Sequence, residues 1–205
     1  MYKVFVNERP LILTDKIVKP EEGEYFMMNG DQVLTAVEAL RKSKIPRAYV
    51  YHPNREEILN KFCKYVPRVV AAGGVVTNKK GQVLFIYRND KWDIPKGICK
   101  KKEKLPDCAI REVEEETGVR DLKIENFLRT TYHIFKRKGK FWLKEVHWYA
   151  MKTTYEGKLV GEASEGIEKV KWKGPRKIRK ALENSYVNIR LFFQRPAEQF
   201  RVPAG

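Results

Sequence analysis

The stretch that decides the fold is residues 97–119, which read GICKKKEKLPDCAIREVEEETGV. Nine positions in this stretch have a fixed spacing: Gly97, Glu103, Arg111, Glu112, Val113, Glu115, Glu116, Gly118 and Val119. From average residue usage, such a set would arise by chance in a chain of 205 residues less often than about once in ten million. The spacing is therefore a specific signal, whereas a bare run of glutamates is usually a solvated helix surface.

Residues 107–117 are predicted to form an amphipathic helix. At about 100° per residue, the apolar side chains gather on one side, and Glu112, Glu115 and Glu116 gather on another within roughly 100° of arc. Glu114 falls near the opposite edge and is expected to face solvent. Gly118 suits the left-handed position that ends a helix.

Three like charges in adjacent turns repel one another, so this acidic face calls for a neutralising partner. A hard divalent ion such as Mg²⁺, with Mn²⁺ as an alternative, prefers carboxylate oxygens, waters and phosphates. Arg111 can orient a carboxylate of Glu112 or Glu115 through a charge-assisted bond, or it can form an ordinary helix ion pair. Gly97 suits a tight loop whose backbone carbonyls approach a metal.

The chain resembles the Nudix hydrolase superfamily over about residues 68–195, because residues 97–119 match the whole Nudix box. The resemblance implies an α/β/α sandwich with a mixed sheet and the hydrolysis of a nucleoside diphosphate linked to another moiety. By resemblance, Glu112, Glu115 and Glu116 are metal ligands, and the carbonyl of Lys96 or Gly97 is a further ligand. Glu103 and Arg111 support the site, and bound Mg²⁺ would activate water and neutralise charge on the phosphates.

Many members of the superfamily take a catalytic base or a further ligand from a loop well downstream of the box. Three glutamates, Glu162, Glu165 and Glu168, lie just before the strand expected at residues 170–172. We favour Glu165 because Gly166 gives its loop freedom, although each residue taken alone is more typical of a surface glutamate.

Substrate contacts are expected near the start of the box. The segment 92–97, WDIPKG, resembles superfamily branches that act on dinucleoside polyphosphates, diphosphoinositol polyphosphates or capped mRNA. Lys96, Lys101 and Lys102 are predicted to share one loop beside the metals, where they either bind phosphates or remain solvated. Arg88 could bind a phosphate from the preceding strand.

The alternation of apolar residues predicts an α+β protein with two domains. Residues 1–66 read as a small α/β domain of unknown role, with strands at 2–6, 11–13 and 48–51 and helices at 32–40 and 54–62. Residues 67–205 form the Nudix domain, with strands at 69–77, 82–87, 127–136, 141–152 and 170–172, and C-terminal helices at 176–183 and 186–193.

Composition limits the function classes. The chain holds 42 Lys and Arg against 26 Asp and Glu, a net charge of +16 that favours an anionic partner. Its 42% hydrophobic content excludes wholesale disorder, and the absence of a long apolar run predicts a cytoplasmic protein that does not use a membrane. Cys63, Cys99 and Cys108 form no CxxC pair, which favours reduced thiols over a disulfide framework or a zinc site.

Three functions remain open. The leading one is a Mg²⁺-dependent pyrophosphohydrolase acting on a small anionic polyphosphate. The others are an mRNA-decapping enzyme and a sensor that uses a Nudix domain to regulate or bind nucleic acid, which the net charge allows but does not favour. An intact set of metal carboxylates favours an enzyme. The sequence is compatible with a monomer or a homodimer.

Overall fold

The computed structural model describes residues 1–17 and 23–193, and the chain divides into two compact units. Unit 1 consists of Met1–Val69 and Thr131–Glu145, and unit 2 contains Val70–Thr130 and the chain from Val146 onward. The expected division between residues 66 and 67 lies close to this boundary, but it assigned residues 131–145 to the second domain. Residues 194–205 of that expected domain lie outside the described residues.

Unit 1 is a small α/β layer, as expected for its first 66 residues. Its elements are β1 (Tyr2–Val6), β2 (Arg9–Thr14), β3 (Glu24–Met27), α1 (Gly30–Arg41), β4 (Ala48–Tyr51) and α2 (Ile58–Cys63). The sheet order is β1-β2-β4-β3, and β1 also pairs in parallel with residues 132–134 of β9 (Leu122–Arg137). The second stretch of unit 1 therefore adds a strand to a sheet that the first stretch begins.

Helix α1 begins where the sequence provides a cap. The Asn29 side chain accepts a hydrogen bond from the Gln32 backbone N–H at 3.0 Å. Its buried residues recur at helical spacing and pack on the unit 1 sheet: Val33, Ala36, Val37 and Leu40. Helix α2 begins later than expected, because the Asn54 side chain instead closes a turn by accepting from the Glu56 N–H.

Unit 2 carries the box. Its strands are β5 (Arg68–Thr77, which starts in unit 1), β6 (Val83–Arg88), β7 (Lys91–Asp93), β8 (Lys96–Ile98), β11 (Lys169–Lys173) and parts of β9 and β10 (Lys140–Thr153). The strand order is β11-β6-β5-β10-β9, with β7 paired to β6 and β8 paired to β5. Its helices are α3 (Leu105–Thr117), α4 (Pro175–Glu183), α5 (Val187–Phe193) and the 3-10 turn η1 (Ala163–Glu165).

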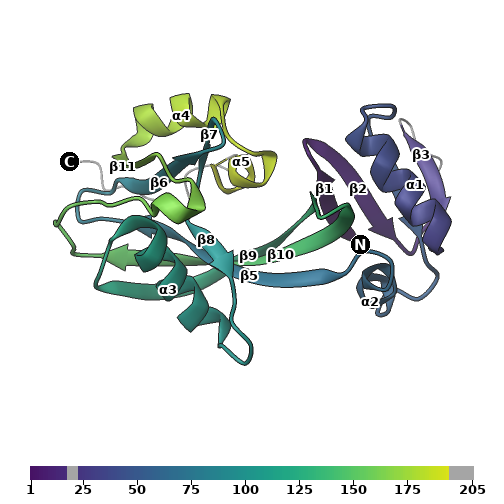
Figure 1. Cartoon of the computed structure of the whole chain (residues 1–205), viewed down its shortest axis with the longest axis horizontal. Helices are drawn as coiled ribbons and strands as arrows, with labels where there is room; N and C mark the ends of the chain where they lie inside the picture. The colour runs from purple at the N-terminus through teal and green to yellow at the C-terminus, as the bar shows by residue number, and fades with distance from the viewer. Residues whose placement is uncertain (18–22, 194–205) are drawn as a thin grey trace. The chain divides into compact units, whose positions relative to one another are not determined.

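The two faces of this sheet bury separate clusters, which makes unit 2 an α/β/α sandwich (Figure 1). On one face, Leu84 and Ile86 pack with Val113 of α3. On the other, Val83 and Phe85 pack with residues of α4 and α5. Alternate residues of β6 therefore serve opposite layers. The predicted α/β/α sandwich is present, and the sheet is mixed as expected, because strand pairs of unit 2 such as β5–β6 are antiparallel and pairs of unit 1 such as β2–β4 are parallel.

Helix α3 spans the predicted helix with two residues added at its start. It ends at Gly118, which adopts φ 73° and donates its N–H to the Glu114 carbonyl at 2.9 Å. The predicted left-handed cap is present. Among the described residues, no helix has the length and apolar character needed to cross a bilayer.

Candidate active site

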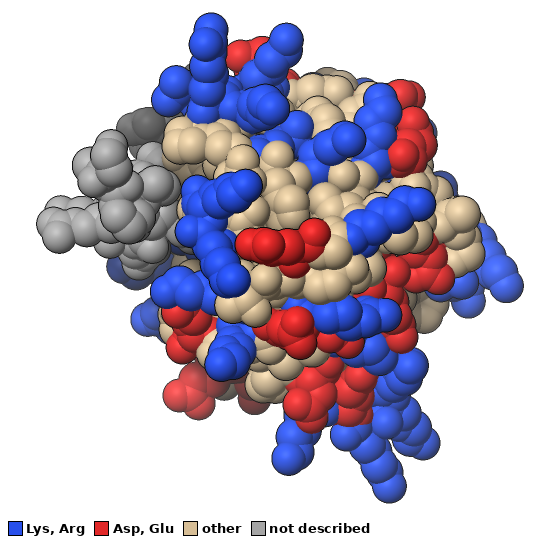
Figure 2. All heavy atoms as spheres, turned by 90° about the vertical axis from the view of Figure 1, so that its left-hand side faces the viewer, with Lys and Arg blue, Asp and Glu red and all other residues tan. Residues whose placement is uncertain are grey.

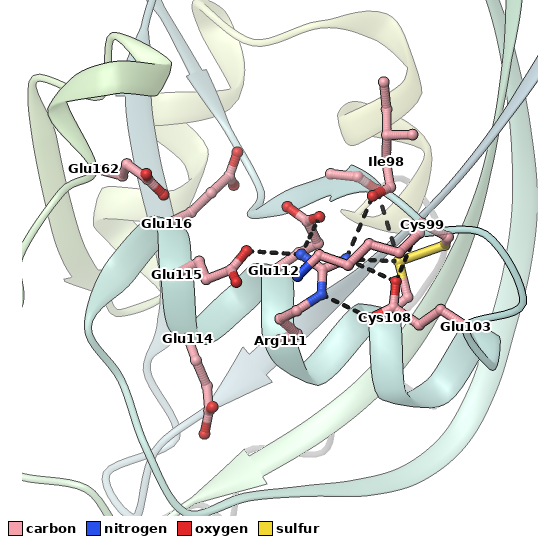
Figure 3. Close-up of polar contacts among 12 residues, drawn as sticks. Ile98, Cys99, Glu103, Cys108, Arg111, Glu112, Glu114, Glu115, Glu116 and Glu162 are labelled. Atoms are coloured by element: carbon pink, nitrogen blue, oxygen red, sulfur yellow. Dashed lines mark hydrogen bonds and ion pairs between the residues drawn. A yellow bond between two sulfur atoms is a disulfide. The ribbon is translucent and has the colours of Figure 1, made fainter.

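The acidic face of α3 gathers the three glutamates that the periodicity placed together (Figure 3). Their exposure rises along a gradient: the side chain of Glu116 is 2% exposed, that of Glu112 13% and that of Glu115 46%. Glu114 points away from this group and lies 3.9 Å from Arg120, but its side chain is 31% exposed, less than that of Glu115, so it is not the most solvent-exposed glutamate of the helix as expected. Buried and exposed carboxylates thus stand side by side on one helix.

Arg111 donates hydrogen bonds to three glutamates of the box. Its Nε and Nη2 donate to the two carboxylate oxygens of Glu103 at 2.7 and 2.8 Å. Its Nη1 donates to Glu112 Oε1 at 2.6 Å and to Glu115 Oε2 at 2.7 Å. The hydrogen bonds from Arg111 lower the pKa of Glu103 to about 2, and the bonds to Glu103 raise the pKa of Arg111. Arg111 therefore orients two carboxylates while one oxygen of each is left free of it.

Glu116 is fixed from two sides. Arg88 Nη1 lies 3.1 Å from Glu116 Oε1, and the Lys96 backbone N–H donates to Glu116 Oε2 at 2.9 Å. Burial raises the pKa of Glu116 to about 7, although Lys96 and Arg88 pull it down. Burial also raises the pKa of Glu112, and the charges of Glu115 and Glu165 add to this effect. These carboxylates are thus poised to gain from a cation.

A buried ion pair lies behind Glu116, and the sequence analysis did not identify it. Lys96 Nζ lies 2.5 Å from Asp93 Oδ2, and both side chains are buried. Burial opposes the charge of Asp93, but Lys96 and Arg88 outweigh it and lower the pKa of this carboxyl. Lys96 was expected to share one loop with Lys101 and Lys102, where it would bind phosphates or remain solvated. It lies in β8 instead, and its ammonium is held by Asp93.

The Arg88 side chain is less exposed than we would expect of a side chain that binds a substrate phosphate. Its side chain is 14% exposed and contacts Glu116, Glu165 and Asp93, the last at 3.8 Å. In the sequence, Arg88 was recognisable only as an arginine at the end of a predicted strand. In the structure this strand, β6, pairs with β7 and β11. Long-range strand pairing decides its partners, so the local sequence could not reveal them.

Gly97 lies in β8 and not in the tight loop that we expected. A Cβ built on Gly97 would lie 1.7 Å from Glu112 Oε2, so any larger residue would displace that carboxylate. The Gly97 carbonyl oxygen lies 4.0 Å from Cys108 Sγ. Glycine is required here because the Glu112 carboxylate occupies the space that a side chain at position 97 would need.

The downstream glutamates lie on and around η1. Glu165 Oε2 lies 3.5 Å from Arg88 Nη1, so Glu165 shares Arg88 with Glu116. The Glu162 carboxylate accepts from the Ser164 hydroxyl at 2.8 Å, and Glu168 is exposed. Of these three glutamates, Glu165 therefore reaches the group around Glu116, and its side chain is 58% exposed.

The loop between β8 and α3 departs from expectation at its cysteines. Cys99 and Cys108 form a disulfide that closes this loop onto α3, and Cys63 is free. The expectation of three reduced thiols is wrong, because the fold brings residues nine positions apart together. The Glu103 carboxylate lies beside both sulfurs but is held by Arg111, so we assign no metal to this group. Lys101 and Lys102 are exposed on the same loop.

A cavity of about 530 Å³ opens beside the acidic face. Glu114, Glu115 and Gly118 line it from α3 and its cap, and further lining residues include Arg120, Tyr155, Lys158 and Glu162. Its lining mixes carboxylates, cations and one aromatic ring, which suits a polar ligand with a flat group.

The donor set fits a hard divalent cation. Arg111 occupies one oxygen of Glu112 and one of Glu115, and the second oxygen of Glu112 lies against the backbone of Gly97, in the position that a Cβ would take. Carboxylate oxygens of this kind are the ligands that Mg²⁺ or Mn²⁺ takes in proteins. Glu112, Glu115 and Glu116 would hold the ion.

Comparisons with known proteins identify relatives over part of the chain. The chain is 34% identical over 77 residues to mRNA decapping complex subunit 2 of Schizosaccharomyces pombe, covering 36% of this chain and 10% of that protein. It is 33% identical over 75 residues to mRNA-decapping enzyme subunit 2 of Arabidopsis thaliana, covering 35% of this chain and 20% of that protein. The chain thus spans a fifth or less of these relatives.

Among solved structures, the Ap4A hydrolase of C. elegans in a binary complex is 25% identical, with a TM-score of 0.46, covering 61% of this chain and 95% of that one. The family model of the NUDIX domain matches residues 67–192, which run from the residue before β5 into α5. Because this match spans more than half of the chain and includes the entire box, the chain belongs to the Nudix hydrolase family.

Proposed function

We propose that this chain is a Mg²⁺-dependent pyrophosphohydrolase that cleaves a phosphoanhydride bond in a dinucleoside polyphosphate or a similarly anionic small molecule. The observation that carries this proposal is the convergence of Glu112, Glu115 and Glu116 on one face of α3, where the lack of a side chain at Gly97 makes room for the Glu112 carboxylate. Such a group of carboxylates serves metal-assisted hydrolysis, in which the ion activates water and neutralises charge on the phosphates.

Each residue near the box has a role in this proposal. Glu112, Glu115 and Glu116 bind the cation, and Arg111 with Glu103 keeps two of these carboxylates in place. Glu165 takes the proton of the attacking water, since its exposed carboxylate lies beside the Arg88 that also holds Glu116. Lys101 and Lys102 meet phosphates remote from the bond that is cut.

A second candidate is the removal of a cap from RNA. It is favoured by the 33% and 34% identity to decapping subunits over 75 and 77 residues. These relatives are much longer than this chain, and the matched segments cover only about a third of it. We therefore rank a small polyphosphate first.

The test is a substrate panel assayed for product release with Mg²⁺, with Mn²⁺ and with excess chelator. The panel contains a sugar nucleotide, a four-phosphate dinucleotide, an inositol pyrophosphate and capped RNA. We expect metal-dependent release that is fastest for the dinucleotide. Faster cleavage of capped RNA at moderate salt would favour the second candidate, and no hydrolysis of any compound would favour a sensor.

Matched variants of α3 test the metal assignment. We expect Glu116→Gln, which keeps the shape but removes the charge, to lower turnover at least about 100-fold with unchanged circular dichroism. Asp107→Asn removes an exposed carboxylate from the first turn of the same helix, outside the cavity lining, and should stay within about twofold of wild type. Equal rates for wild type and Glu116→Gln would refute the metal assignment.

A further inference from the structure

One surface of unit 2 carries a dense group of cations on consecutive elements. Residues 169–182 of β11 and α4 contain seven Lys and Arg and no Asp or Glu. Six of these cations are exposed, and we call them the basic face: Lys169, Lys171, Arg176, Lys177, Arg179 and Lys180. Figure 2 shows Lys and Arg side chains gathered over the upper part of this side of the molecule, where α4 lies in Figure 1.

The charge of the basic face is not compensated. Among described residues, none of its six cations forms an ion pair, although carboxylates elsewhere on the chain pair readily with Lys and Arg. The seventh cation, Lys173, is buried with its ammonium 3.3 Å from the centre of the Trp92 ring. Burial lowers the pKa of Lys173, and the charges of Lys177 and Lys171 lower it further. The face therefore has a net attraction for anions.

The spacing of the cations suits a chain of regularly placed anions. Lys169 and Lys171 are alternate residues of a strand, which places them roughly 6.6 Å apart on the same side. Cations three and four positions apart on α4, such as Arg176 and Lys180, lie roughly 5–6 Å apart at their Cβ atoms. These separations are comparable to those between neighbouring phosphates of an extended nucleic-acid strand.

Two other polyanionic partners fit less well. Insertion into an anionic membrane uses exposed apolar side chains, and the exposed large hydrophobic residues among described positions all lie outside β11 and α4. A stable protein partner would need an apolar centre to the contact, which the exposed side of α4 lacks. Backbone phosphate contacts need charge alone.

We propose that the basic face binds the phosphate backbone of a single-stranded nucleic acid. One end of the face lies beside the acidic site, because Lys169 pairs with Tyr87 across the β11–β6 ladder, and Tyr87 directly precedes Arg88. The proposal concerns binding and not turnover. It therefore goes beyond the proposed hydrolysis and can fail without it.

The test is fluorescence anisotropy of a 5′-labelled 20-nucleotide oligouridine with full-length protein, in excess chelator so that no hydrolysis occurs. The triple variant Lys171→Gln, Lys177→Gln and Lys180→Gln should bind at least about tenfold more weakly at 50 mM salt. Since each phosphate contact on a single strand adds about 0.7 to the slope of log K against log salt, the slope should fall by about 2.

A control variant removes the same charge elsewhere. Lys44→Gln, Lys64→Gln and Lys123→Gln replace three exposed lysines outside the basic face and should change the affinity less than about threefold. Thermal unfolding of both variants checks that they fold. Equal weakening by the two triple variants, or displacement of the oligouridine by poly-glutamate as effectively as by unlabelled RNA, would overturn the proposal.

Discussion

Asp93 is the residue on which the buried side of the site depends. It accepts from the Ile94 N–H at 2.8 Å and compensates the ammonium of Lys96, whose own backbone N–H holds Glu116. A buried charge that loses its partner destabilises a protein more than removal of the whole pair does. The Asp93–Lys96 pair thus ties the stability of unit 2 to the geometry of a proposed metal ligand.

We predict that Asp93→Asn lowers the free energy of unfolding by about 3–5 kcal/mol, because it leaves Lys96 buried without its carboxylate. Adding Lys96→Met, which removes the second charge and keeps an apolar stem, should recover most of this loss. Urea denaturation measures both variants. A single variant within about 1 kcal/mol of wild type would contradict the role of the pair.

Glu165 gives a second prediction at this scale. Glu165→Gln should lower kcat more than Glu162→Gln or Glu168→Gln, because Glu165 contacts the Arg88 that holds Glu116. A loss of roughly 10²-fold or more is expected for a proton acceptor, against less than about threefold for the two neighbours. Initial rates at saturating substrate give the comparison. Equal rates for the three variants would remove Glu165 from the site.

At the level of residues, the sequence revealed what depends on local periodicity. Glu112, Glu115 and Glu116 had to share a face once residues 107–117 formed a helix, and the structure places them so. The burial of Lys96 and the enclosure of Arg88 depend on strands that pair across the fold, which no local pattern encodes.

At the level of elements, the loop between β8 and α3 carries two exposed lysines beside the acidic face. The double variant Lys101→Gln with Lys102→Gln should raise KM for a four-phosphate dinucleotide roughly 3- to 10-fold, and less than about twofold for a two-phosphate sugar nucleotide. Exposed charges are screened beyond about 8 Å, so the difference should shrink with added salt.

The turn between β5 and β6 supplies the control for this loop, since Lys79 and Lys80 are also adjacent and exposed. Lys79→Gln with Lys80→Gln should leave both KM values within about twofold of wild type. If the loop variant affects both substrates alike, its lysines do not select for phosphate chain length.

The disulfide gives the second prediction for this loop. Closing a loop between residues nine positions apart stabilises a fold by about 2–3 kcal/mol, so Cys99→Ala should lower the free energy of unfolding by that amount. Dithiothreitol should bring wild type to the level of the variant. Thiol titration of the native, unreduced protein should detect one free cysteine, Cys63, and detection of three would contradict the pairing.

Elements with strong alternation or helical spacing could be predicted, as could the four-residue β4 with its continuous apolar run, whereas three other short strands could not. Strands β1 and β4 match their predicted limits, and α3 differs only at its start. Strands β3, β7 and β8 have four or fewer residues, so their identity comes from the neighbours with which they pair. The Cys99–Cys108 bond likewise depends on how β8 lies against α3.

For the whole molecule, unit 1 is built from two separate stretches of the chain, so removing the first stretch should affect the second. Ile134 and Leu143, from β9 and β10, are buried in the same cluster as α1 and β2. We predict that deletion of residues 1–66 gives an aggregating or strongly destabilised protein, because exposing each such side chain costs about 1.5–3 kcal/mol. Size-exclusion chromatography and thermal unfolding measure the outcome.

A second deletion separates this explanation from a general need for residues 1–66. Replacing residues 131–145 with a short Asn-Gly turn in the truncated chain removes the apolar tip of the hairpin, and it should restore a monodisperse protein. If the simple truncation is already as soluble and stable as the full chain, the hairpin tip does not depend on unit 1.

Strands β9 and β10 contribute residues to both units, and this division affects the order in which the two units can complete their sheets during synthesis. Residues 1–69 leave the ribosome first, but strand β1 pairs with residues 132–134, which are made only after more than sixty further residues. At 5–20 residues per second, translation from Val69 to Glu145 takes roughly 4–15 s. Unit 1 therefore completes its sheet late, and its edge at β1 stays open while much of unit 2 is still being translated.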